Sequence, residues 1–88
     1  MLSYLGIHAN SLQDFCKKIR TIDVKSIEFH INREDFENWI TSLGDIELAR
    51  RISLLKKRDL AGEELRQAVY QTAKNRCEEI EIIVRMWG

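Results

Sequence analysis

Apolar residues recur along most of the chain at steps of three and four, which is the period of an α-helix with one buried face. The clearest case is a set of four large residues on one helix face: Phe36, Trp39, Ile40 and Leu43. We expect a helix here over about residues 33–43, with Asn32 as its N-cap. Gly44 should end this helix, because glycine adopts the left-handed conformation that often follows a last turn.

The same period predicts three more helices. The first runs over about residues 11–21, and another runs from Ile46 to Lys56 with Asp45 as its N-cap. The last runs from Glu63 to about Trp87, and a helix of about 25 residues is about 37 Å long. A compact chain of this length has a diameter of roughly 31 Å, so the end of the last helix should project beyond the body.

Three stretches give a less definite pattern. Residues 26–31 fit an alternating strand pattern, whereas Val24, Ile27 and Ile31 fit a helix capped by Asp23. We favour the helix, since no other stretch is a convincing partner strand. The β-branched residues of 80–87 would also permit a strand, and residues 1–9 give no clear pattern.

The sequence therefore predicts an all-α fold, in which residues 1–88 form a single compact domain of four to five helices with a long C-terminal helix. Its expected core consists of the apolar residues on the inward helix faces: Leu12, Phe15, Ile19, Ile27, Phe36, Trp39, Ile40, Leu43, Leu48, Ile52, Leu55, Leu65, Val69 and Ala73.

Composition narrows the possible functions. Fourteen basic and fourteen acidic residues cancel, so no global charge draws the chain to nucleic acid or to an anionic membrane. No apolar run approaches the roughly 20 residues that span a bilayer, and the N-terminus does not resemble a signal peptide. We expect a cytoplasmic protein whose two cysteines, Cys16 and Cys77, are reduced thiols. We expect no cofactor and no catalytic residues, because no nucleophile motif or phosphate-binding loop is present.

Two segments resemble a small archaeal and bacterial helical domain family of unknown function. They are Ser26-Ile-Glu-Phe-His and Asp35-Phe-Glu-Asn-Trp-Ile, followed by Leu43-Gly44-Asp45 and Glu47-Leu48-Ala49. The similarity covers roughly residues 6–60 and rests on order and spacing. It implies an α-helical fold and supplies no activity or site residue.

His30 is the most notable polar residue, because Glu34 lies one helical turn away and Asp35 is next to it. These three side chains are weak candidates for a metal or ligand site. A zinc site normally needs a further nitrogen or sulfur ligand, which a distant residue would have to supply. The simpler interpretation is that His30 bridges two helices and is hydrogen-bonded to an acid.

A basic run gives a second candidate site, for nucleic acid. Its members have no acid between them: Arg50, Arg51, Lys56, Lys57 and Arg58. Such a run can contact phosphates, although no aromatic residue is interleaved for base stacking. A solvated helix face is the simpler interpretation.

The C-terminal end gives a third candidate site, for protein contact. Its apolar residues have little of the chain left to cover them: Ile83, Val84, Met86 and Trp87. Exposed apolar groups at one place often mark an interface. The leading hypothesis is therefore a non-enzymatic interaction or regulatory module that self-associates or binds another protein through its last helix. Binding to nucleic acid and binding of a metal or ligand at His30 are the alternatives.

Overall fold

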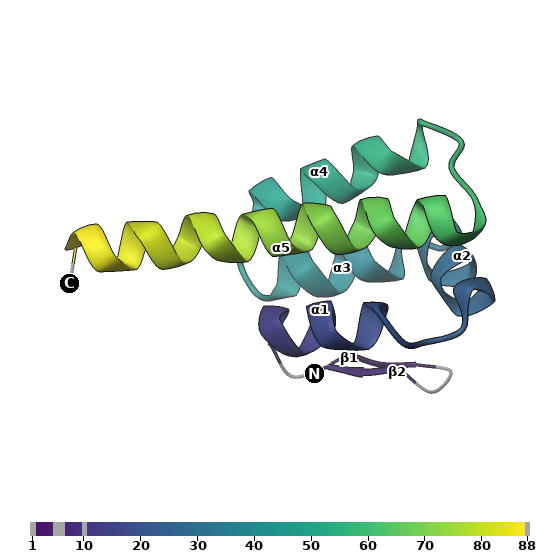
Figure 1. Ribbon diagram of the computed structural model, residues 1–88, viewed down its shortest axis with the longest axis horizontal. Coiled ribbons are helices and arrows are strands. Elements are labelled where there is room, and N and C mark those ends of the chain that lie inside the picture. The colour runs from purple at the N-terminus through teal and green to yellow at the C-terminus, as the bar shows by residue number, and fades with distance from the viewer. Residues whose placement is uncertain (1, 5–6, 10, 88) are drawn as a thin grey trace.

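The computed structural model describes residues 2–4, 7–9 and 11–87, with side chains described for residues 11–86. These residues form an all-α core of five helices, preceded by a short hairpin (Figure 1). The helices are α1 (Leu12–Ile19), α2 (Val24–Asn32), α3 (Asp35–Ser42), α4 (Ile46–Lys56) and α5 (Gly62–Trp87). The predicted fold class and long last helix are confirmed, and residues 26–31 and 80–87 are helical.

Local capping signals set several of the helix starts. Ser11 accepts a hydrogen bond from the Asp14 N–H at 3.2 Å, Asp23 accepts one from Lys25, and Asp45 accepts one from Leu48. Each side chain satisfies a backbone donor that has no partner inside the helix. Gly44 follows α3 with a φ of 91°, the left-handed conformation expected of it.

The start of α3 differs from the prediction. Asn32 is the last residue of α2, and α3 begins at Asp35 instead of Arg33. Glu34 occupies the N-cap position in a left-handed conformation, with a φ of 64° and no side-chain capping bond. Two residues, Arg33 and Glu34, thus separate the helices, so the turn is longer than expected, and no side-chain capping bond defines it.

The buried side chains form one cluster in which all five helices take part. Phe15 of α1 lies edge-on to Phe36 of α3, with ring centroids 5.1 Å apart, and 5.4 Å from the Trp39 ring. The prediction that Leu43 belongs to the core is wrong, because this residue follows the last turn of α3 and is 44% exposed. Leu12 only packs against the edge of the cluster. The other predicted core residues are buried, and Ile31, Ala49 and His30 join them.

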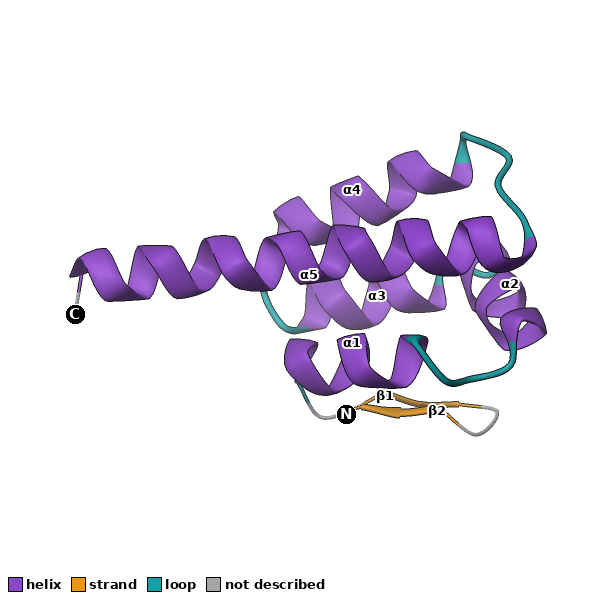
Figure 2. Ribbon diagram, in the orientation of Figure 1, coloured by secondary structure: helices purple, strands orange, loops and turns teal. Residues whose placement is uncertain are grey.

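A hairpin precedes the helices. Strands β1 (Leu2–Tyr4) and β2 (Ile7–Ala9) pair in antiparallel fashion, with Ser3 opposite His8. The hairpin lies beside α1, at the edge of the helical layer (Figure 2). Three residues in each strand are too few for a clear alternating pattern, so the sequence did not predict it.

The long axis of the molecule follows α5. The 26 residues of this helix span about 39 Å at 1.5 Å per residue, and the molecule measures 39 × 25 × 21 Å. Figure 1 shows the C-terminal end of α5 extending past the other helices. Among the described helices, none combines the length and the apolar character needed to cross a membrane.

Candidate functional site

His30 lies at the junction of α2 and α3. Its side chain is fully buried, and its Nδ1 atom lies 2.8 Å from Oδ2 of Asp35, near the start of α3. The imidazole also packs against the Phe36 ring, with centroids 5.3 Å apart. This arrangement links the end of one helix to the start of the next, which is the interpretation that the sequence favoured for His30.

Glu34, the third residue proposed for this metal or ligand site, does not point towards His30. Glu34 is 49% exposed, and its carboxylate lies 3.9 Å from the Lys56 ammonium group of α4. Across residues 11–86, no three histidine, cysteine or acidic side chains gather into a group that could hold a metal ion. The structure therefore brings together His30 and Asp35, and it directs Glu34 to a different partner.

The basic run of α4 divides into two parts. Arg50 and Arg51 both donate hydrogen bonds to Glu47, and Arg51 also makes two bonds to the Glu79 carboxylate, at 2.7 and 3.0 Å. The two arginines are thus already neutralised within the protein. The exposed remainder follows at the end of α4: Lys56, Lys57 and Arg58.

These ion pairs belong to a larger network that joins α4 to α5. On α5, Arg76 contacts Glu79 at 3.4 Å and donates through Nε to both carboxylate oxygens of Asp45, at 2.9 and 3.1 Å. The hydrogen bonds from Arg50 and Arg51 lower the pKa of Glu47 from 4.5 to about 2. Arg51 likewise lowers the pKa of Glu79. These ion pairs and hydrogen bonds fix α5 on α4 as far as Glu79.

Beyond that point, α5 has no cover from the other helices. Every described side chain from 81 to 86 is exposed, and four of them are large and apolar: Ile82, Ile83, Val84 and Met86, at 56, 48, 61 and 79% exposure. Of the predicted interface residues, Ile83, Val84 and Met86 are thus at the surface. The Trp87 side chain lies outside the described residues.

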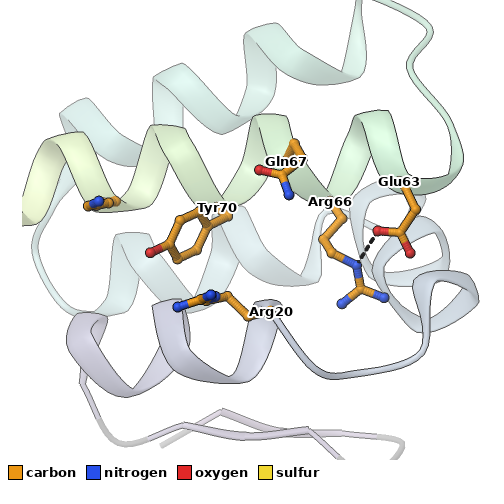
Figure 3. Close-up of a pocket in the computed structure, with 6 residues that line it drawn as sticks. Arg20, Glu63, Arg66, Gln67 and Tyr70 are labelled. Carbon is orange, nitrogen blue, oxygen red and sulfur yellow. Dashed lines mark hydrogen bonds and ion pairs between the residues drawn. The ribbon is translucent and has the colours of Figure 1, made fainter.

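A groove between α1 and α5 is a site that the sequence did not suggest (Figure 3). Its volume is about 530 Å³, and its walls are formed by Arg20, Glu63, Arg66, Gln67, Tyr70 and Lys74. The Arg20 guanidinium lies 5.4 Å from the centroid of the Tyr70 ring, and the Lys74 ammonium lies 5.9 Å from it. The groove therefore has three cationic groups and one carboxylate.

Of the three cationic side chains in the groove, Arg66 is paired with a carboxylate, whereas Arg20 and Lys74 are not in the described part of the chain. Arg66 donates hydrogen bonds to Glu63 and to the Ile19 carbonyl oxygen, both at 2.7 Å. Within residues 11–86, Arg20 and Lys74 have no carboxylate partner and contact the tyrosine ring instead. The sequence does place Arg66, Tyr70 and Lys74 at four-residue steps. It gives no sign that Arg20, which is 50 residues from Tyr70, completes the groove.

Comparison with known proteins identifies the family. Residues 5–74 match the model of a family of unknown function, DUF5752. Because this match covers far more than half of the chain, the chain belongs to that family. No curated protein and no solved structure matches the chain.

Proposed function

We propose that this DUF5752 family member is a non-enzymatic interaction module that self-associates through the projecting end of α5. The observation that carries the proposal is the cluster of Ile82, Ile83, Val84 and Met86 on that end, each about half exposed or more. Large apolar side chains that gather at one place on a surface commonly mark a protein contact.

The direction of this apolar face supports a helix partner. Leu65, Val69 and Ala73 are buried in the core and recur every four residues along α5. Further steps of three and four residues along the same helix face lead to Ile80 and then to Ile83 and Val84. The apolar stripe that packs on the other helices therefore continues beyond the point where those helices end. A partner helix can cover it as α1 and α4 cover the earlier part.

A second copy of the chain is the occupant that we favour. A two-fold interface needs a self-complementary surface, and two identical apolar helix ends satisfy this requirement. With equal numbers of basic and acidic residues, two copies have no net charge repulsion to overcome. Leu43 and Ile46, exposed by 44 and 73%, flank Asp45, which binds α5 at Arg76. They add apolar surface beside the start of the projecting end.

The expected affinity is modest. Burying a fully exposed aliphatic side chain contributes about 1.5–3 kcal/mol, so a half-exposed one contributes about 1 kcal/mol. Four such residues in each of two copies give about 8 kcal/mol, and Leu43 and Ile46 add to this sum. Association itself costs about 4 kcal/mol or more. If Leu43 and Ile46 add up to about 4 kcal/mol, the net free energy is about 4–8 kcal/mol, which corresponds to a dissociation constant between about 1 µM and 1 mM. Dimer formation should thus become visible within this range of protein concentration.

Analytical ultracentrifugation across that concentration range tests the proposal. Ile83→Glu places a charge in the apolar stripe and should abolish the dimer. Arg85→Glu is the matched control, since Arg85 is two positions away and points about 200° around the helix from Ile83. It should dimerise like the parent, and circular dichroism should show equal helix content in all three proteins. A parent that stays monomeric throughout, or equal dimerisation of both variants, would refute the proposal.

The groove supports a second candidate function, binding of a small anion. Arg20 and Lys74 flank Tyr70 without a carboxylate partner among the described side chains, so their charge remains available to a ligand. This site is better placed for an anion than Arg50 and Arg51, whose charges Glu47 and Glu79 already neutralise.

Titration with inorganic phosphate, followed by NMR, tests this second function. Shifts should concentrate at Arg20, Tyr70 and Lys74, and they should disappear in the double variant Arg20→Gln/Lys74→Gln. The matched control Lys57→Gln/Arg58→Gln removes two charges far from the groove and should bind as the parent does. Shifts that spread evenly over all basic side chains would contradict a defined site.

A further inference from the structure

The two cysteines of the chain meet across the interface of α1 and α5. The Sγ atoms of Cys16 and Cys77 are 4.0 Å apart, although 61 residues separate them in the sequence. Both residues are free thiols with partly exposed side chains. In a chain with only two cysteines, this contact brings together all of its thiol chemistry.

A small surface cavity gives access to this pair. It has a volume of about 280 Å³ and is lined by Gln13, Cys16, Lys74, Cys77, Glu78 and Glu81. Since both cysteines border the cavity, a small reagent can approach either sulfur from solvent. A purely structural thiol of a protein core would lack this access.

We propose that Cys16 and Cys77 form a dithiol site that low-molecular-weight disulfides oxidise reversibly to an intramolecular disulfide bond. A disulfide requires its two sulfurs to lie about 2.05 Å apart. From the observed 4.0 Å, each sulfur has to move by about 1 Å, which rotation about the Cα–Cβ bonds can supply.

The reaction proceeds by two thiol–disulfide exchanges. The thiolate of one cysteine attacks one sulfur of the small disulfide, which forms a mixed disulfide at that cysteine and releases a first thiolate. The thiolate of the other cysteine then attacks the protein sulfur of the mixed disulfide and releases the second. The reagent takes up the two electrons and the two protons that the protein thiols lose. The small disulfide thus becomes two small thiols, and the two protein thiols become one protein disulfide.

Burial makes both thiols weaker acids than a free cysteine. Burial, and then the neighbouring Cys77, raise the pKa of Cys16 to about 12. Burial also raises the pKa of Cys77. Either thiol can donate the hydrogen bond between them, so a thiolate on one sulfur has the thiol of the other beside it. Because both thiols are protonated at neutral pH, the rate of oxidation should increase as the pH rises.

The charges around the cavity favour some reagents over others. Glu78 and Glu81 carry two negative charges on its rim, and Lys74 carries one positive charge. The local excess is negative, so a cationic disulfide such as cystamine should react faster than the anionic glutathione disulfide. The double variant Glu78→Gln/Glu81→Gln should reduce this preference, since it removes the negative charge and leaves both thiols in place.

The disulfide would join α1 to α5 next to the point where α5 leaves the body. It would close a loop of about 60 residues, which strongly restricts the unfolded chain. For a domain of this size, we expect the thermal midpoint to rise by at least about 10 °C. Cys77 is two residues from Glu79, so the new bond would reinforce the same segment that the ion network holds.

Treatment of the full chain with cystamine at pH 8.5 tests the proposal. Mass spectrometry should show a loss of two hydrogen atoms with no adduct, the count of free thiols should fall from two to zero, and dithiothreitol should restore both. Cys16→Ser is the matched control: it should retain a cysteamine adduct on Cys77, because the second thiol is missing. Cys77→Ser should likewise retain one adduct, on Cys16.

Three results would overturn the proposal. They are a stable adduct in the parent protein, disulfide-linked dimers as the main product, or an unchanged thermal midpoint after oxidation. Faster oxidation by glutathione disulfide than by cystamine would refute the assigned reagent class.

Discussion

Asp45 both caps α4 and forms an ion pair with α5, and two substitutions can separate these roles. Its Oδ1 atom accepts the Leu48 N–H at 3.0 Å, which caps α4, and both of its oxygens bind Arg76 of α5. The residue is only 9% exposed, so water replaces either interaction poorly. Asp45→Ala removes the cap and the ion pair together, whereas Asp45→Asn retains a capping oxygen and removes only the charge.

The two variants should differ by a calculable amount. Loss of an N-cap costs about 1 kcal/mol, in a range of about 0.5–2 kcal/mol. Removing the partner of a fully buried charge costs about 3–5 kcal/mol, but Arg76 is 20% exposed and keeps Glu79, so about 1–2 kcal/mol is more appropriate here. We therefore expect Asp45→Ala to lower the free energy of unfolding by about 2–3 kcal/mol and Asp45→Asn by about 1–2 kcal/mol.

Urea denaturation followed by circular dichroism measures both values. A double-mutant cycle that combines Asp45→Asn with Arg76→Gln isolates the ion pair, since the single effects should not add if the two side chains interact. Equal losses in Asp45→Ala and Asp45→Asn would refute the assigned cap. Additive effects of Asp45→Asn and Arg76→Gln would refute the assigned ion pair.

Three further substitutions test the core and the surface charges. Trp39→Ala should lower the free energy of unfolding by about 3–5 kcal/mol in urea denaturation, because Trp39 is 7% exposed and packs on Phe15; an unchanged midpoint would contradict this core assignment. Glu37→Gln should stabilise the protein at pH 7, because burial raises the pKa of Glu37 and so penalises its charged form. The gain should shrink as the pH falls through the raised pKa of Glu37 and be lost below about 4.5, and a gain that is independent of pH would contradict the cause. Glu47 has a lowered pKa, so its contribution to stability is complete above pH 4.5 and is lost as the pH falls towards 2. Thermal melts of Glu47→Gln should therefore depend less on pH across that window than those of the parent, and parallel curves would count against the role of Glu47.

Local signals explain why the helices could be predicted from the sequence. Gly44 and Asp45 end one helix and start the next through conformations and hydrogen bonds that involve only their near neighbours. The junction of α2 and α3 lacks such a signal. There, Glu34 adopts a left-handed conformation and the His30–Asp35 contact holds the turn, so the apparent capping residue Asn32 is absorbed into α2. A contact between two side chains five positions apart therefore overrides the capping propensity of Asn32 at this point.

The candidate sites also differ in whether local sequence could predict them. The exposed stripe at Ile83 and Val84 was predictable, because a helical pattern that continues past the rest of the chain is visible in the sequence. The ion pair between Arg51 and Glu79, the Cys16–Cys77 contact and the position of Arg20 over Tyr70 link residues that are 28 to 61 positions apart. Only the packing of α5 against α1 and α4 brings these side chains together, so no spacing rule in one sequence could identify them.

The long helix therefore has two parts with different roles. Up to Glu79, its inward side chains are buried or paired, and the last cross-helix ion pairs and hydrogen bonds of the described residues are those of Arg76, Cys77 and Glu79. Beyond them, the apolar stripe continues although no other helix is present to bind it. An apolar surface that folding does not bury adds nothing to the stability of the monomer, and it exposes the protein to nonspecific association. The ion pairs of Arg76 and Glu79 fix the base of this segment on α4, and the partner helix that we propose would dock on the apolar stripe beyond it.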